Sequence, residues 1–152
     1  MKIIAKNKRA YFDYHIIDKW EAGLVLTGAE VKSVKAGHIN LKGSFVSLID
    51  NVPKMVNCHI SSYKHAKSAQ KDYDPTRARR MLLNKKEVSS LIGLLQQKGL
   101  TLLPLSVYTR NGFVKVELGL CKGKKMHDKR EILKKKDIDR EIAQTMRNKT
   151  SR

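Results

Sequence analysis

The feature that most constrains the fold is a pair of apolar segments late in the chain, residues 100–108 and 113–121, which flank Arg110-Asn111-Gly112. Asn-Gly between two such segments is a strong signal for a β-hairpin, because these residues adopt the positive φ angles of the tight turn. In the second segment apolar residues alternate with others from Val114 onward. Side chains alternate across a strand, so one face is expected in a core, with Lys115 on the other face.

Four further segments have strand character: residues 11–17, 23–26, 44–49 and 55–60. They are rich in β-branched and aromatic residues, and the turn-prone Asp50-Asn51 separates the last two. Together with the hairpin, these segments predict six short strands.

Two helices are expected, near residues 28–36 and 85–98. Residues 27–30, Thr-Gly-Ala-Glu, form a capping box, and Gly37 supplies a left-handed stop for the first helix. Residues 84–87, Asn-Lys-Lys-Glu, are a weaker variant of the same box at the start of the second helix.

This order of elements favours a mainly β fold with some α structure: a closed β-barrel with helices on its surface. Closure hides edge strands that would otherwise pair with other chains. We expect an oligonucleotide-binding (OB-like) barrel over residues 1–121 and a basic C-terminal tail over residues 122–152. A length of 152 residues is that of one typical domain.

The charge of the chain points to a polyanionic partner. Lys and Arg number 32 and Asp and Glu 14, so the formal net charge is +18. The tail contributes +7 and residues 1–121 contribute +11, so both parts are basic. The positive charges repel one another, and bound phosphates would offset this repulsion. Only 9 residues are aromatic, which provides few stacking platforms for single strands, so structured RNA fits better.

Enzymatic, metal and membrane classes find little support in the sequence. Cys58 and Cys121 lie in apolar segments without metal-ligand spacing, so both are expected to be small core residues and no metal or cofactor is expected. The five histidines show no catalytic or metal motif. No segment approaches the roughly 20 apolar residues of a membrane span, and none resembles a signal peptide. We expect a cytoplasmic protein that is not an enzyme.

A long polar segment, residues 61–80, carries several basic side chains and is expected to be functional or mobile. Asp74-Pro75-Thr76-Arg77 within it is a turn, because Asp caps and Pro fixes φ. The turn either aims Arg77 and Arg80 at RNA or is purely structural, with solvated arginines.

Two candidate RNA-binding positions lie near the first strands. Asn7, Lys8 and Arg9 place an amide and two cations at a barrel rim, unless this segment is a frayed basic terminus. Glu21 is an acidic residue in a basic chain, and a carboxylate can accept hydrogen bonds from ribose hydroxyls or base amines. The alternative for Glu21 is an ion pair with a local Lys or Arg.

The tail has a different composition. No aromatic residue follows Lys122, and runs such as Lys134-Lys135-Lys136 repel each other along a helix. Ile138, Ile142 and Met146 nevertheless recur every four residues, which suits a face that meets a partner. We predict that the tail is disordered when free and helical when bound. A tail that only improves solubility is the alternative.

Seven short motifs occur in an order typical of one family. They are Asn7-Lys8-Arg9-Ala10, residues 21–28, Glu30-Val31-Lys32-Ser33, Asp74-Pro75-Thr76-Arg77, Leu82-Leu83-Asn84, Lys115-Val116 and residues 123–130. Each is weak alone, but seven in order are not expected by chance. On these residues the sequence resembles the SsrA-binding proteins, also called small protein B, along essentially its whole length.

The resemblance implies an oligonucleotide-binding barrel that holds the tRNA-like domain of transfer-messenger RNA (tmRNA). It implies a tail that becomes helical in the empty messenger channel of a stalled ribosome, near the small-subunit decoding centre. The alanine-charged RNA, with elongation factor Tu as a further partner, is then delivered to the empty A site for trans-translation: the ribosome is rescued and the nascent chain is tagged for degradation. Peptidyl transfer remains the ribosome's chemistry, so the protein is expected to position RNA rather than to catalyse.

The resemblance also implies roles for individual residues. The RNA-binding set is Asn7, Glu21, Leu82 and Lys115, supported by Lys8, Arg9 and Arg77, and it extends to Lys32 and Lys122. The set expected to reach the decoding centre is Lys124, Lys125, His127, Asp128, Lys129 and Arg130, followed by Lys134, Lys135 and Lys136. The sequence departs from the usual family pattern at Trp20 and Ala78.

Two other functions stay open from the residues alone. A generic ribosomal or RNA-chaperone barrel would share the basic surface but would have no use for the ordered residues 123–130. A metal-dependent nuclease is the enzymatic alternative that is hardest to exclude.

Overall fold

The computed structural model describes residues 1–150, apart from the side chains of 67–69 and 149–150, so the last two residues of the expected tail lie outside the described residues. The chain divides into two units, Met1–Lys122 and the segment from Gly123 onward. The strands of the first unit are β1 (Lys2–Lys6), β2 (Tyr14–Leu24), β3 (Ile39–Asn40), β4 (Phe45–Ser47), β5 (Lys54–Val56), β6 (His59–Ile60), β7 (Arg79–Leu82), β8 (Leu100–Arg110) and β9 (Phe113–Gly123). Its helices are α1 (Lys8–Asp13), α2 (Gly28–Lys35) and α3 (Lys85–Leu95), with short 3-10 helices at Ile49–Asn51 and Lys64–Gln70.

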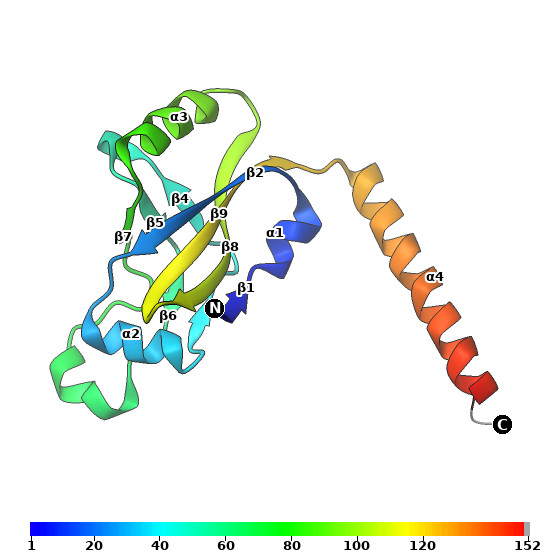
Figure 1. Ribbon diagram of the computed structural model, residues 1–152, viewed down its shortest axis with the longest axis horizontal. Helices are drawn as coiled ribbons and strands as arrows, with labels where there is room; N and C mark the ends of the chain where they lie inside the picture. Colours follow the sequence, from blue (N-terminus) through cyan, green and yellow to red (C-terminus); the bar gives the residue numbers. More distant parts are fainter. Residues whose placement is uncertain (151–152) are drawn as a thin grey trace. The chain divides into compact units, whose positions relative to one another are not determined.

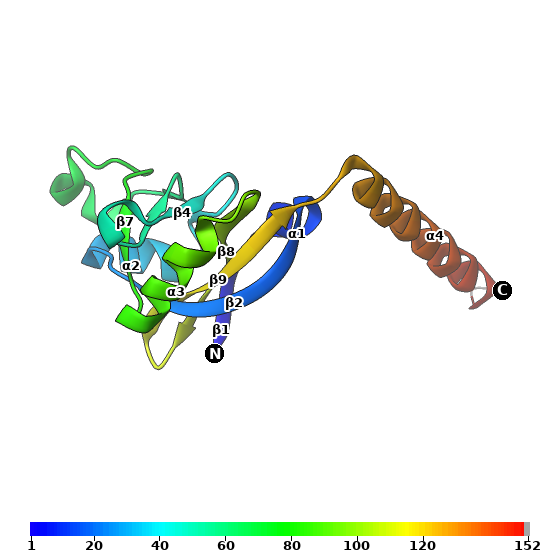
Figure 2. The ribbon, with the colours of Figure 1, turned by 90° about the horizontal axis from the view of Figure 1, so that it is seen from above.

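A seven-stranded sheet in the order β1-β8-β9-β2-β7-β5-β4 forms the centre of the first unit, and β3 pairs with β6 beside it. Figure 1 shows α3 at one end of these strands and α2 at the other, and Figure 2 shows the sheet from above. The expected mainly β fold with helices is confirmed. The expected closed barrel is not: pairing among the described strands ends at β1 and β4, although β4 lies against β8.

The hairpin prediction is confirmed: both strands begin at the predicted residue and end two residues later than predicted. β8 and β9 pair antiparallel from Leu100 opposite Lys122 to Arg110 opposite Phe113. Asn111 and Gly112 have φ angles of 51° and 80°, as the two-residue turn requires. Val114 and Val116 are buried, and Lys115 lies on the other face.

The predicted strand over residues 11–17 is wrong at its start. Residues 8–13 form α1, because the Asn7 side chain accepts a hydrogen bond from the Ala10 amide (3.2 Å) and caps this helix. The strand then runs unbroken from Tyr14 to Leu24, so the segments at 11–17 and 23–26 belong to one strand. Strands β1, β3 and β7 were not predicted, and β5 and β6 were predicted as a single strand.

The capping box is confirmed at α2, and at α3 the N-cap half of the predicted box is confirmed. Thr27 and Glu30 exchange the two hydrogen bonds of a capping box at α2, at 3.2 and 3.0 Å, and Gly37 follows with a φ of +90°. Asn84 accepts from the Glu87 amide (2.9 Å) at the start of α3. α3 ends at Leu95, three residues before the predicted end.

Two apolar clusters cover the two faces of the sheet. The larger contains Val107, Val116 and Leu118. The smaller joins Ala10 of α1 to Leu103, Leu105 and Cys121, so helix α1 covers one end of the face that carries Lys115. Cys58 and Cys121 are both fully buried, as predicted, and burial raises the pKa of each thiol to about 11.

The second unit is one helix, α4 (Met126–Thr150). Ile138, Ile142 and Met146 lie on it with 56%, 51% and 66% of their surface exposed, so the apolar line is available to a partner. The predicted change between disorder and helix stays a prediction. None of the helices in the described part of the chain is both long and apolar enough to span a membrane.

Candidate nucleic-acid interface

A cluster of four polar residues occupies the exposed face of β2, β8 and β9. It consists of Glu21, Tyr108, Arg110 and Lys115, and we call it the Glu21 cluster. Tyr108 donates its hydroxyl hydrogen to Glu21 Oε2, and Arg110 Nη1 lies 3.3 Å from the same oxygen. Lys115 stands opposite Tyr108 in the β8–β9 pairing. The predicted ion pair of Glu21 therefore exists, but with a residue 89 positions away rather than a local one.

The Glu21 carboxylate is held ionised and accessible. The hydrogen bond from Tyr108 lowers its pKa; burial opposes this shift, and the charges of Arg110 and Lys115 add to it. Burial and the bond to Glu21 raise the pKa of Tyr108, so its hydroxyl keeps its proton. The Glu21 side chain remains 39% exposed and that of Arg110 59% exposed. The cluster thus presents an oriented acceptor beside two cations.

Leu82 shares this face. It pairs with Gly23 of β2, and a Cβ on Gly23 would lie 3.3 Å from the Leu82 Cβ, so both positions are on the same side of the sheet. Glu21 lies two residues before Gly23 and therefore points to that side as well. Leu82 is 56% exposed, which is unusual for a large apolar residue in a strand flanked on both sides. The structure thus brings Glu21, Lys115 and Leu82 together.

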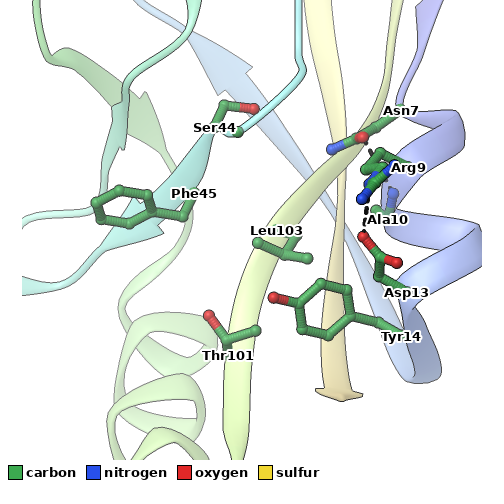
Figure 3. A pocket seen from close by; sticks show the side chains of 10 residues that line it. Asn7, Arg9, Ala10, Asp13, Tyr14, Ser44, Phe45, Thr101 and Leu103 are labelled. Carbon is green, nitrogen blue, oxygen red and sulfur yellow. Dashed lines mark hydrogen bonds and ion pairs between the residues drawn. The ribbon is translucent and has the colours of Figure 1, made fainter. Parts of the chain in front are cut away.

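Asn7 is not on this exposed face. It is 5% exposed, its Nδ2 donates to the Pro104 carbonyl (2.9 Å), and its Oδ1 caps α1. The alternative of a frayed terminus is therefore wrong for this residue. Lys8 and Arg9 are exposed on α1, where Arg9 Nε lies 2.8 Å from Asp13 Oδ2 (Figure 3).

Arg77 belongs to a buried ionic network instead of a solvated turn. Arg77 Nη2 donates to Glu30 Oε1, and Arg79 Nε donates to Glu30 Oε2 at 2.6 Å. Glu30 and Arg79 are both fully buried, and the Tyr73 hydroxyl bonds to the same carboxylate at 3.1 Å. The turn at Asp74 is present, with its Oδ1 accepting from the Thr76 amide (3.0 Å).

The same network sets the ionisation of Glu30. Burial alone would raise its pKa, but the hydrogen bonds from Arg77, the Thr27 amide and Arg79 outweigh burial and hold the pKa at about 2. The polar segment expected to be functional or mobile is therefore partly structural. The burial of Arg79 was not predicted. Arg79 and Met81 stand two residues apart in one strand and are both buried, and this alternation is the signal in the sequence that places Arg79 inward.

The remaining basic candidates lie elsewhere. Lys32 is exposed on α2, with its ammonium 5.6 Å from the centre of the Tyr63 ring. Lys122 is exposed on β9, seven residues and so roughly 23 Å along the strand from Lys115. Neither residue joins the Glu21 cluster.

The decoding-centre candidates lie at the start of the second unit. Asp128 Oδ2 accepts from the Lys125 amide at 3.3 Å, which caps α4, and His127 Nε2 lies 3.2 Å from Glu131 Oε1. Lys129, Arg130 and Lys134, Lys135 and Lys136 continue along the helix, whereas Lys124 precedes it. No group of three or more potential metal-ligating side chains occurs within the described residues.

Comparison with known proteins gives a consistent result. The sequence model of the SmpB protein family matches residues 4–148. The SsrA-binding protein of Sulfurihydrogenibium sp. (strain YO3AOP1) is 50% identical over 148 residues, which cover 97% of this chain and 96% of that protein. The SsrA-binding protein of Shouchella clausii (strain KSM-K16) is 47% identical, with coverage of 97% and 94%. A solved structure described as "tmRNA-SmpB: a journey to the center of the bacterial ribosome" has a TM-score of 0.66 and 43% identity, covering 80% of this chain and 85% of that one.

Proposed function

This chain belongs to the SmpB protein family, and from that premise we propose that it binds the tRNA-like domain of tmRNA, the SsrA RNA, and delivers it to the empty A site of stalled ribosomes. The result is rescue of the ribosome by trans-translation and tagging of the nascent peptide for degradation. The protein acts as an RNA-binding factor in the cytoplasm, and the chemical steps belong to the ribosome. Elongation factor Tu, with the alanyl-charged RNA, is the further partner that we propose.

The Glu21 cluster is the observation that carries the RNA-binding part of the proposal. A generic basic surface attracts phosphates but has no reason to fix a carboxylate among them. Here Tyr108 and Arg110 orient Glu21, so that the carboxylate can accept hydrogen bonds from ribose hydroxyls or base amines while Lys115 meets a phosphate. Leu82 offers an apolar contact on the same face. This mixture suits the folded surface of a structured RNA better than a flexible strand.

The other candidates take supporting roles in this proposal. Asn7 fixes α1 and so places Lys8 and Arg9 for phosphate contacts. Arg77 forms an ion pair with Glu30, and we propose that this pair orders the segment before β7. Only the exposed part of the Arg77 side chain is then able to contact RNA. Lys32 and Lys122 extend the positive surface. The contact between β4 and β8 supports an oligonucleotide-binding barrel as the parent architecture.

We assign the second unit to the ribosome. Its basic first turns, with Lys124, Lys125, His127, Lys129 and Arg130, suit the ribosomal RNA of the decoding centre. The rest of α4, from Lys134 onward, carries cations and an exposed apolar line that suit the empty messenger channel. We propose that this helix is disordered until the channel supplies the neutralising phosphates.

The test combines RNA identity with a salt titration. RNA that copurifies with the full chain is sequenced, and a dominant tRNA-like species with an internal reading frame is expected. Lys115→Gln should then weaken binding to that RNA and reduce the slope of log affinity against log salt by about one unit. Lys54→Gln removes an exposed strand cation from β5, outside the Glu21 cluster, and should leave the slope unchanged. Equal affinity for unrelated structured RNAs would support a generic chaperone instead, and cleavage of RNA in Mg²⁺ would support a nuclease.

A further inference from the structure

A concave site lies at the far end of strand β8 from the Glu21 cluster. It is a cavity of about 300 Å³ between α1 on one side and the start of β4 on the other. Figure 3 shows Arg9 and Asp13 on the α1 wall, Ser44 on the opposite wall, and Leu103, Tyr14 and Thr101 between them. Thr101 precedes Tyr108 by seven residues, so the two sites are roughly 23 Å apart along the strand.

The lining combines an apolar floor with a fixed cation at the mouth. Leu103 is 7% exposed and belongs to the small apolar cluster with Ala10, and the Tyr14 ring packs against the same cluster. Arg9 is 67% exposed, and its Nε is held 2.8 Å from Asp13 Oδ2 on the next turn of α1. The ion pair engages Nε, and the opposite end of the guanidinium, formed by the two Nη groups, can donate two hydrogen bonds to a phosphate.

We propose that this cavity binds one unpaired ribonucleotide, with its base against Leu103 beside the Tyr14 ring and its phosphate at Arg9. The volume lies at the lower end of the range for small-ligand pockets, which suits a single nucleotide and excludes a peptide helix. An inorganic anion would leave the apolar floor unused. Bases that are splayed out of a strand are bound in this way, over an apolar or aromatic surface and beside an Arg side chain.

This inference rests on the proposed function, which already assigns Arg9 to phosphate contacts, and deepens it: the cavity shares no residue with the Glu21 cluster and holds a single base rather than a folded surface. The nucleotide has two possible sources with the same chemistry: the RNA held at the Glu21 cluster and the ribosomal RNA. The test below separates them.

The first experiment is a titration of the ¹⁵N-labelled full chain with adenosine and uridine 5′-monophosphates, followed by amide chemical shifts. Saturable shifts are expected at Ser44, Thr101 and Leu103, and not at Lys115. Arg9→Gln should weaken binding of the monophosphates about tenfold, the effect of losing one charge-assisted contact, and should leave binding of the parent nucleosides nearly unchanged. Lys42→Gln removes an exposed cation next to the cavity that does not line it, and should change either affinity less than twofold.

A second variant fills the site. Thr101→Leu adds bulk where Thr101 faces the cavity, on a half-buried strand position, and should abolish the shifts at Ser44 while the thermal unfolding midpoint stays near that of the parent chain. Shifts that do not saturate, or equal losses in Arg9→Gln and Lys42→Gln, would show that the cavity is empty and that only general electrostatics acts.

The source follows from two further binding measurements with Arg9→Gln and Thr101→Leu. Loss of affinity for the copurifying RNA assigns the nucleotide to that RNA, and loss for small ribosomal subunits alone assigns it to ribosomal RNA. An unchanged affinity for both would overturn the proposal. Glu21→Gln should weaken binding of the structured RNA without changing the monophosphate titration, so failure of the proposed function and failure of this site are distinguishable.

Discussion

Replacing Tyr108 with Phe tests whether Glu21 acts through its orientation. The substitution removes only the hydroxyl that donates to Glu21 Oε2, and the ring stays in place because Tyr108 is 6% exposed. In Tyr108→Phe the carboxylate keeps Arg110 as its one described hydrogen-bond donor, at 3.3 Å and on an exposed side chain. Glu21 is then free to sample several rotamers, and an RNA that binds one of them must select it.

The structure limits the magnitude of this effect. A hydrogen bond to a charged group contributes about 1.5–3 kcal/mol, but Glu21 is 39% exposed, so water replaces part of the lost bond. We therefore expect the free energy of unfolding to fall by about 1 kcal/mol. For RNA, a penalty of about 1 kcal/mol corresponds to roughly a fivefold weaker affinity. The pKa of Glu21 should rise, because the Tyr108 hydrogen bond is the main cause of its lowering.

The assay is a double-mutant cycle of Tyr108→Phe and Glu21→Gln, with affinity for the copurifying RNA as the readout. If Tyr108 acts only through Glu21, the double variant binds as weakly as Glu21→Gln alone. Multiplicative losses in the double variant would refute this reasoning and would place Tyr108 itself in contact with RNA. Carboxyl ¹³C titration of Glu21 in the free protein provides a readout that a general loss of packing would not shift in the same direction.

Three further outcomes are expected. The folded-state pKa of Glu30, about 2, lies below its ordinary value of 4.5, so the stability that its ionised form contributes is present above pH 4.5 and is lost as the pH falls through 4.5 toward 2. The urea midpoint should therefore fall between pH 6 and pH 2.5, and a flat profile would contradict this expectation. Gly119→Ala should lower the free energy of unfolding by about 1–3 kcal/mol, because the new Cβ would lie 2.6 Å from Leu105 Cδ1. The Cβ of Gly93→Ala in α3 meets nothing within 4 Å, so this variant should raise the free energy of unfolding by about 0.5–1 kcal/mol. Thermal melts of both variants compare the two directly. Deleting the chain after Lys122 should leave RNA binding nearly intact and abolish tagging on stalled ribosomes in a reconstituted translation assay; equal loss of both activities would argue against separate roles for the two units.

The parts of the fold that were predictable from sequence are those fixed by local chemistry. The turn at Asn111-Gly112 and the capping box from Thr27 to Glu30 each depend on residues a few positions apart, so the pattern alone determines the structure. Asn7 shows the limit of such reasoning. It is also a good capping residue, but the apolar and aromatic residues after it match a strand. Its hydrogen bonds to Leu105 and to Pro104, which is 97 positions away, hold Asn7 where it can cap α1.

The buried network around Glu30 could not be predicted for a related reason. Glu30 reads as a capping residue and Arg79 as one of many cations in a polar segment, and nothing nearby in sequence pairs them. Burial of two opposite charges is favourable only with excellent geometry and further hydrogen bonds, which the Tyr73 hydroxyl and the Cys58 carbonyl supply. The number of Lys and Arg residues therefore overstates the number of cations that can face RNA, because at least the Arg79 side chain is fully buried.

The residues that support Glu21 are likewise hidden in the sequence, although the resemblance identified Glu21 itself. Glu21 and Lys115 stand in recognisable motifs, whereas Tyr108 lies in an apolar strand and looks like one more core residue. Its function appears only when β9 is placed between β8 and β2, which brings a hydroxyl from one strand across to a carboxylate on another. A basic surface with a rigidly oriented acid can discriminate among RNAs of equal charge, because a misplaced phosphate meets a fixed negative charge. We therefore expect substitutions at Tyr108 and Glu21 to alter the discrimination among RNAs before they alter the affinity.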